Sequence, residues 1–269
     1  MADPQQDQAE RDYLKPKAGE ELEQKTVTQK AMSRLQVAAG AIAETKRAIP
    51  HQGNQVASLK ATKMNSMARL RVMRDDSCWE YTTDLARQLA YENQEADMAA
   101  KADLAHGGNC GEHAWVAYHY LRLHAKGEKI QVSQQKDFDH AFVLVGDLKK
   151  DKDSDIAVSD PWPNNPTACL WEDHFAHCER DMILDHQSQV ADGKSFKQAI
   201  GQCLKLSAYG EQMVAQAASE EQTEKETNAE GAKRNHFWNH DDTATPKYDY
   251  KTESAQPQPQ GEQQQPQVQ

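Results

Sequence analysis

A glycine-flanked cysteine most constrains what this chain can fold into: residues 107–111 read Gly-Gly-Asn-Cys-Gly and stand directly before a helical pattern. Apolar residues recur at steps of three and four from Ala114 to Leu121, and counting back along this face reaches Cys110. The cysteine is therefore predicted to begin a helix on its buried side, with Gly127 as the stop. The first NH groups of a helix favour negative charge, so a thiolate forms readily there and an oxyanion can be held. A small buried cysteine that only closes a turn fits the same position.

Two strand signals follow this helix, and each carries a polar residue at its end. His140 precedes the apolar run 141–145 and is placed to act as the base that a thiol nucleophile needs. If the polar loop 148–154 closes an antiparallel hairpin centred near position 150, facing residues sum to about 300, and His140 lies opposite Asp160. An acid there would orient the imidazole as the third member of a triad. Each residue also has an ordinary structural reading, as a strand-end histidine and as a turn aspartate before proline.

Together, Gly-Asn-Cys-Gly opening a helix, Asp-His-Ala-Phe-Val opening a strand and Val-Ser-Asp-Pro-Trp closing the next resemble the core of papain-like and transglutaminase-like cysteine hydrolases. The resemblance is closest to enzymes among secreted bacterial toxins and effectors, including glutamine deamidases. It covers residues 109–162, about a fifth of the chain. It implies that Cys110 is the nucleophile, His140 the general base and Asp160 the orienting acid, without a cofactor. The fold class it implies is α+β, with the nucleophile helix packed on a small antiparallel sheet.

The surroundings of the cysteine depart from this family pattern in one respect. Papain-like peptidases carry a glutamine several residues before the cysteine for the oxyanion hole, whereas Leu104 stands at the nearest matching position. The expected donors are the backbone NH of Cys110 and a second group, for which Asn109 is the candidate. His113, one helical turn after the cysteine, and Trp162, after the strand-ending aspartate and proline, are expected to line the site. The short connection from the cysteine to the histidine favours a minimal core over a two-lobed peptidase.

A zinc site is the alternative for two clusters of metal-binding residue types, but neither has the paired Cys-x-x-Cys spacing of a structural zinc site. No metal is therefore expected. The five cysteines are odd in number and irregularly spaced, which is typical of free thiols in a reducing compartment. The two clusters comprise His106, Cys110 and His113, and His174, His177 and Cys178.

The chain is predicted to hold one folded domain between polar ends. Mean hydropathy is −0.92, and apolar residues gather between residues 78 and 209. We expect a disordered segment at 1–28, a helical extension at 29–74, the catalytic domain at 75–218 and a disordered Gln/Pro-rich tail at 219–269. Expected helices span 31–49, 59–73, about 77–106, 110–127, 171–180 and 196–217, and expected strands span 129–133, 140–145 and 156–159.

The net charge of the chain excludes some classes of main partner. The formal net charge is −11, which argues against nucleic acid or an anionic membrane surface as the main partner. No apolar window approaches the roughly 18 residues of a membrane span, and the first residues lack the basic and apolar regions of a Sec signal. We therefore expect a soluble bacterial protein, exported by a non-Sec route, acting on a protein in a target-cell cytosol. A secretion chaperone is a possible partner of the N-terminal region.

The leading hypothesis is a thiol hydrolase that attacks an amide carbon, forms a thioester on Cys110 and releases ammonia or an amine. Deamidation of a protein glutamine is preferred over peptide-bond cleavage on the resemblance alone, and transamidation differs only in the acceptor. The competing class is a non-enzymatic adaptor or an inactive member of the family. In that case the tails and the helix at 31–49 would bind the partner.

Overall fold

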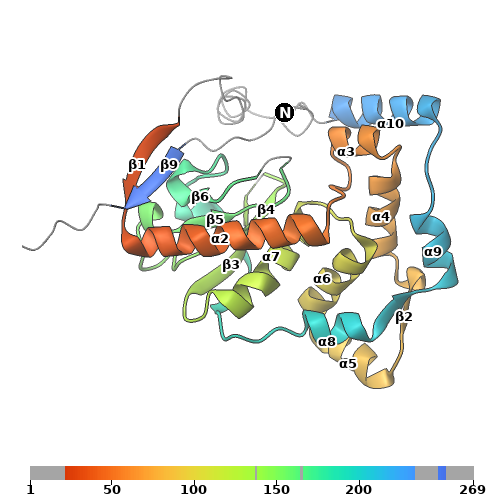
Figure 1. Cartoon of the computed structure of the whole chain (residues 1–269), viewed down its shortest axis with the longest axis horizontal. Helices are drawn as coiled ribbons and strands as arrows, with labels where there is room; N and C mark the ends of the chain where they lie inside the picture. The colour runs from red at the N-terminus through yellow and green to blue at the C-terminus, as the bar shows by residue number, and fades with distance from the viewer. Residues whose placement is uncertain (1–21, 137, 164–165, 234–247, 253–269) are drawn as a thin grey trace, which may run out of the picture.

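A five-stranded antiparallel sheet, with strand order β6-β5-β4-β3-β7, organises the part of the chain that carries the motif residues (Figure 1). The structure is a computed structural model and describes residues 22–136, 138–163, 166–233 and 248–252. The fold class is α+β, as predicted. The strands are β3 (Lys129–Gln135), β4 (Ala141–Val145), β5 (Ala157–Ser159), β6 (Cys169–Leu170) and β7 (Ile183–Val190).

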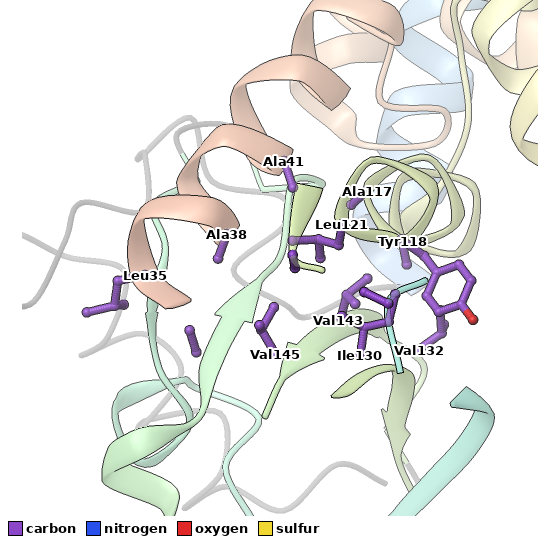
Figure 2. Packing of buried hydrophobic residues seen from close by; sticks show 14 of the residues in the cluster. Leu35, Ala38, Ala41, Ala117, Tyr118, Leu121, Ile130, Val132, Val143 and Val145 are labelled. Carbon is purple, nitrogen blue, oxygen red and sulfur yellow. The ribbon is translucent and has the colours of Figure 1, made fainter. Parts of the chain in front are cut away.

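Two helices, α2 (Gln29–Ala48) and α7 (Cys110–His124), cover one face of the sheet. Figure 2 shows side chains of both helices directed at those of β3 and β4. Alanines at the contact let the helices lie close to the strands, and Tyr118 and Leu121 fill the remaining space. The helix α2 is thus part of the main core and not of a separate extension.

The opposite face of the sheet has its own apolar layer. Successive side chains of a strand point to opposite faces, so Phe142 and Leu144 of β4 face away from α7. They pack in a second cluster with Trp162 and Trp171. His140 has the same parity as Phe142, which directs it toward this second layer at the end of β4.

A mainly helical part of the fold replaces the single long helix predicted over 77–106. Trp79 and Tyr81 belong to a short strand that pairs with residues 204–206, and the Thr83 side chain caps the next helix. The predicted helix 196–217 is interrupted for the same reason. No described helix is both long and apolar enough to cross a bilayer. The elements are α3 (Val56–Ala61), α4 (Asn65–Arg74), η1 (Asp76–Cys78), β2 (Trp79–Tyr81), α5 (Asp84–Glu92), α6 (Gln94–Ala105), α8 (Lys197–Gln202), β8 (Leu204–Leu206) and α9 (Ala208–Val214).

The helix predicted at 171–180 is also wrong. This stretch holds two short 3-10 turns, η3 (Trp171–Asp173) and η4 (Arg180–Met182), and leads into β7. Strand β7 is largely exposed and polar, so its sequence carries no alternating apolar signal. It forms because it pairs with β3, with a register shift between Val132 and Ser133.

The predicted disordered ends are partly ordered. Strand β1 (Glu23–Val27) pairs in parallel with β9 (Tyr248–Thr252), and α10 (Glu220–Lys233) packs against α3. Lys25 fixes β1 to the main fold through ion pairs with Glu172 at 2.6 Å and Asp173 at 2.7 Å. Disorder predicted for 22–28, 220–233 and 248–252 is therefore wrong, because these segments find tertiary partners. The predictions for 1–21 and 253–269 lie outside the described residues.

Candidate active site

Cys110 is the first residue of α7, as the glycine-flanked motif predicted. Asn109 caps the helix and forms a capping box with Glu112, whose Oε2 accepts from the Asn109 NH at 2.7 Å. The other Glu112 oxygen accepts from Arg74 Nε at 2.9 Å. Both carboxylate oxygens of Glu112 thus accept hydrogen bonds, and these bonds fix the start of α7. The NH groups of Cys110 and Gly111 precede the first intrahelical hydrogen bond, and both residues line a cleft.

The loop 51–55 supports the cysteine turn from behind. The NH of Gly108 donates to His51 O at 3.1 Å, and the NH of Asn54 donates to Asn109 Oδ1 at 3.1 Å. Gly53 has φ +56°, and a Cβ there would lie 1.9 Å from Asn109 Oδ1, so glycine is required. The Asn109 side-chain oxygen therefore accepts a hydrogen bond from the backbone of the loop 51–55. Its assignment to the oxyanion hole stays a prediction.

His140 and Asp160 meet at the ends of β4 and β5, where Nε2 of the histidine lies 2.6 Å from Oδ2 of the aspartate. The predicted register is off by two residues, because Val143 pairs with Ser159. A shift of two preserves the face on which each side chain lies, so the pair contacts diagonally across the strands. Both side chains are buried.

The Cys110 thiol interacts with His140 and is one of the groups that raise the pKa of the imidazole. Because Asp160 engages Nε2, Nδ1 is the ring nitrogen left to exchange a proton with the thiol. Burial opposes protonation of the imidazole, but the charge of Asp160 and its hydrogen bond outweigh that cost, and they raise the pKa of His140 to about 10. The rings of Trp162 and Phe175 cover the histidine at centroid distances of 5.7 and 5.3 Å.

A second histidine, His174, binds the same carboxylate oxygen, with Nε2 at 3.3 Å from Asp160 Oδ2. Its Nδ1 accepts from the NH of Ala176 at 3.3 Å, which assigns the proton to Nε2. Burial lowers the pKa of His174, so the ring donates as a neutral group. Burial alone would favour a protonated Asp160, but the charge and hydrogen bond of His140, with the bond from His174, hold its pKa well below its usual range. Sequence reasoning missed His174, because no strand register links it to the aspartate.

The turn after Asp160 is fixed through the carbonyl oxygen of Trp162. It accepts from Gln52 Nε2 at 2.6 Å and Gln55 Nε2 at 2.8 Å, and Lys46 Nζ lies 3.5 Å away. Neither glutamine was singled out in the sequence, because their burial in a polar loop is visible only in the structure. Trp162 itself lines the cleft, as predicted.

His113 does not line the cleft, contrary to prediction. Its ring is fully buried behind the start of α7, where Nδ1 lies 2.8 Å from Asn109 O. Burial and the charge of the neighbouring Lys46 lower the pKa of His113 to about 3. The ring is thus a neutral packing group at the back of the site.

The cleft in front of Cys110 has a volume of about 330 Å³. Apolar side chains, including Trp115 and Trp162, alternate in its wall with polar ones, so it suits a ligand with a polar end and an apolar stem. Apart from Asn109, its polar lining residues were not among the candidates from the sequence. The lining residues are Arg74, Asn109, Cys110, Gly111, Trp115, Val132, Gln134, Asp139, Ala141, Trp162 and His186.

In each of the two clusters considered for zinc, one histidine is engaged by an oxygen atom outside its cluster. His106 Nδ1 lies 2.9 Å from Ala48 O, and His177 Nε2 lies 2.9 Å from Asp153 Oδ2. Among the described residues, no group of three histidine, cysteine or acidic side chains is arranged to hold a metal ion.

The fold and cleft thus define an α+β protein with a thiol, an imidazole and a carboxylate in series at the start of a helix. No protein family model, curated protein or solved structure matches the chain. A function therefore has to be argued from the geometry of the site.

Proposed function

We propose that the protein is a cysteine hydrolase that deamidates a glutamine side chain of a target protein. The observation that carries this proposal is the buried series from Asp160 through His140 to the Cys110 thiol at the first residue of α7. Each group has the position its role requires: an acid on the imidazole, the imidazole on the thiol, and the thiol in an open cleft.

The reaction proceeds in two halves. Cys110 attacks the carboxamide carbon as a thiolate paired with the protonated imidazole of His140, and backbone NH groups at the start of α7 hold the oxyanion. Collapse breaks the C–N bond, His140 returns its proton to the departing nitrogen, and ammonia leaves a thioester on Cys110. Water then attacks that carbon, gives its proton to His140, and breaks the C–S bond to yield glutamate and the thiol. A pKa near 10 keeps His140 protonated at neutral pH, so the proton that the departing nitrogen needs is already on the imidazole.

A purely structural role explains this arrangement poorly. A buried ion pair is a costly way to stabilise a fold, because the removal of two charges from water offsets most of their attraction. Here the pair has a second histidine on the carboxylate and stands behind a cysteine in a cleft. This combination favours an enzyme over an adaptor or an inactive member.

We further propose that the fold is papain-like or transglutaminase-like. The helix that starts with the cysteine packs on an antiparallel sheet, and the imidazole and carboxylate come from neighbouring strands, which supports this relation. A role as an exported bacterial effector that acts on a host or target-cell protein is part of the same proposal. It rests on the resemblance of the three motifs.

Alkylation tests the activated thiol. We expect iodoacetamide at neutral pH to label Cys110 faster than Cys178, whose thiol has its pKa raised by burial to about 11. The variant His140→Ala should slow labelling of Cys110 and leave Cys203 unaffected. Equal rates at Cys110 and Cys178 in the native protein would remove the basis for a nucleophile.

The intact mass of target proteins after incubation tests the reaction. Deamidation adds about one dalton, cleavage by the alternative cysteine protease activity splits the target, and transamidation adds the mass of an amine. The variant Cys110→Ala should abolish the change, and Cys203→Ser is the matched control that retains it. Target proteins that Cys110→Ala modifies at the native rate would refute the mechanism.

A further inference from the structure

A second pocket of about 730 Å³ lies beside the cleft, and its lining residues come mainly from α4, α5 and α6. Arg74 lines both spaces. Its NH2 lies 2.8 Å from Glu112 Oε1, and this ion pair at the start of α7 forms the wall between them. A ligand that extends from Cys110 toward α5 has to cross Arg74, whose side chain is 54% exposed. The two spaces therefore adjoin at Arg74.

The charged groups of this pocket already have partners. Lys101 Nζ lies 2.8 Å from Asp76 Oδ1 and 2.9 Å from Asp97 Oδ2. The hydroxyl of Tyr81 donates to Asp97 at 2.7 Å. A ligand charge would gain little there, because each internal charge is matched and would have to be separated from its partner. The pocket is consequently not built for a phosphate or another small ion.

Apart from Gln94, its uncharged lining is apolar or aromatic. Met73 and Ala90 are buried in the pocket wall, Met98 is partly exposed beside them, and the Tyr91 ring is 80% exposed. Covering such a ring removes apolar surface from water, and the methionines can adapt to side chains of different shape. A volume of several hundred Å³ is typical of a ligand site. These properties fit an aromatic or long aliphatic group.

We propose that this pocket binds an apolar side chain of the polypeptide substrate, at a fixed distance along the chain from the residue that Cys110 attacks. The inference rests on the proposed function and adds a specificity site to it. A flanking residue of the substrate fits better than a free small molecule, because the pocket adjoins the cleft at Arg74. Tyr91 and Met98 are the residues that determine this preference.

Synthetic peptides provide the test. Each peptide has one glutamine in a glycine–serine background, with tryptophan placed at one position on either side of it, and a tryptophan-free peptide is the reference. We expect kcat/KM for deamidation to rise at one spacing by about tenfold or more, the gain expected for burying an aromatic side chain. Tyr91→Ala should reduce this ratio to about one. Met98→Ala should lower it as well.

Leu85→Ala is the matched control, because Leu85 is 75% exposed on the same helix and lies outside the pocket. It should leave the ratio unchanged. Binding of the same peptides to Cys110→Ala, measured by fluorescence anisotropy, separates the two proposals. Turnover without a preferred spacing, or with a preference that survives both pocket variants, overturns the pocket assignment. Binding that depends on Tyr91 but is accompanied by no turnover in the native enzyme supports the pocket and overturns the proposed function. The absence of both binding and turnover overturns both proposals.

Discussion

Replacing Asp160 with asparagine should destabilise the fold, and the structure sets the size of the effect. Asparagine keeps the shape of the side chain and removes its charge. The carboxylate lies 2.6 Å from His140 and 3.3 Å from His174, and all three side chains are buried. Without the charge, the cost of burying an imidazolium dominates, so the pKa of His140 should fall below its ordinary value of 6.5.

The loss follows from proton linkage. In the native protein the pKa of His140 is about 10, so at pH 7 the folded state holds a proton that the unfolded state mostly releases. Each unit between pH 7 and that pKa corresponds to about 1.4 kcal/mol, which gives about 4 kcal/mol for the pair. The removal of one partner from a buried ion pair typically costs about 3–5 kcal/mol, in agreement. Against a total stability of about 5–15 kcal/mol, the variant should still fold.

The pH dependence has a definite sign. A raised histidine pKa contributes stability that is complete below pH 6.5 and is lost as pH rises through about 10. The lowered pKa of Asp160 contributes stability that is present above its ordinary value of 3.8 and is lost as pH falls. These are two sides of one interaction. The difference between the native protein and Asp160→Asn should thus be largest between about pH 4 and 6.5, and it should fade toward pH 10.

Urea unfolding at pH 5.5, 7, 9 and 10 measures this difference. Glu44→Gln is the control, because Glu44 forms a surface ion pair with Arg47, and such pairs contribute little. Equal midpoints for the native protein and Asp160→Asn at pH 5.5, or a difference that grows as pH rises, would refute the proposed ion pair.

Three further changes test other parts of the fold. His174→Leu should slow alkylation of Cys110, and His174→Gln, which keeps a donor for the Asp160 carboxylate, should restore most of the rate. Equal rates in the native protein and both variants would contradict a positioning role for His174. Burial lowers the pKa of Lys46 to about 7, against the attraction of Asp160, so the folded state carries a penalty below pH 7 that is relieved as pH rises toward 10.5. Lys46→Met should accordingly be more stable than the native protein in urea at pH 6 and lose that advantage above pH 10. Equal stability of the two proteins at pH 6 would contradict the penalty for burying the charge of Lys46. Gly146 has φ +138°, and a Cβ there would lie 2.9 Å from Ile156. Gly146→Ala should therefore cost about 1–3 kcal/mol of unfolding free energy, whereas the control Gly201→Ala should cost much less. Similar melting temperatures for the two variants would disprove the strain at Gly146.

The elements that the sequence predicts well are those with a local cause. The helix at Cys110 starts at a cap and ends near a glycine, and both features lie within a few residues of it. Strands β3, β4 and β5 are apolar runs separated by polar breaks. The contact of His140 with Asp160 follows from the same pattern, because an error of two in the register leaves both residues on one face.

The elements that the sequence does not predict depend on distant partners. Trp79 fits a helical period with Thr83 and Ala86, yet it belongs to a strand that pairs with residues more than a hundred positions away. Strand β7 has almost no apolar signal and exists through its pairing with β3. Among site residues, His174 and Gln52 act through contacts that no local spacing marks. Their roles are set by tertiary packing, which overrides local propensity.

Cys110 packs against both apolar layers of the sheet, whereas its base and acid belong to the layer on the far side from α7. The thiol and the imidazole therefore meet when both layers have closed on the sheet. A chain in which either layer is still open carries a cysteine without its base. The proposed activation of Cys110 by His140 therefore requires the whole sheet and both of its apolar layers, and not the start of α7 alone.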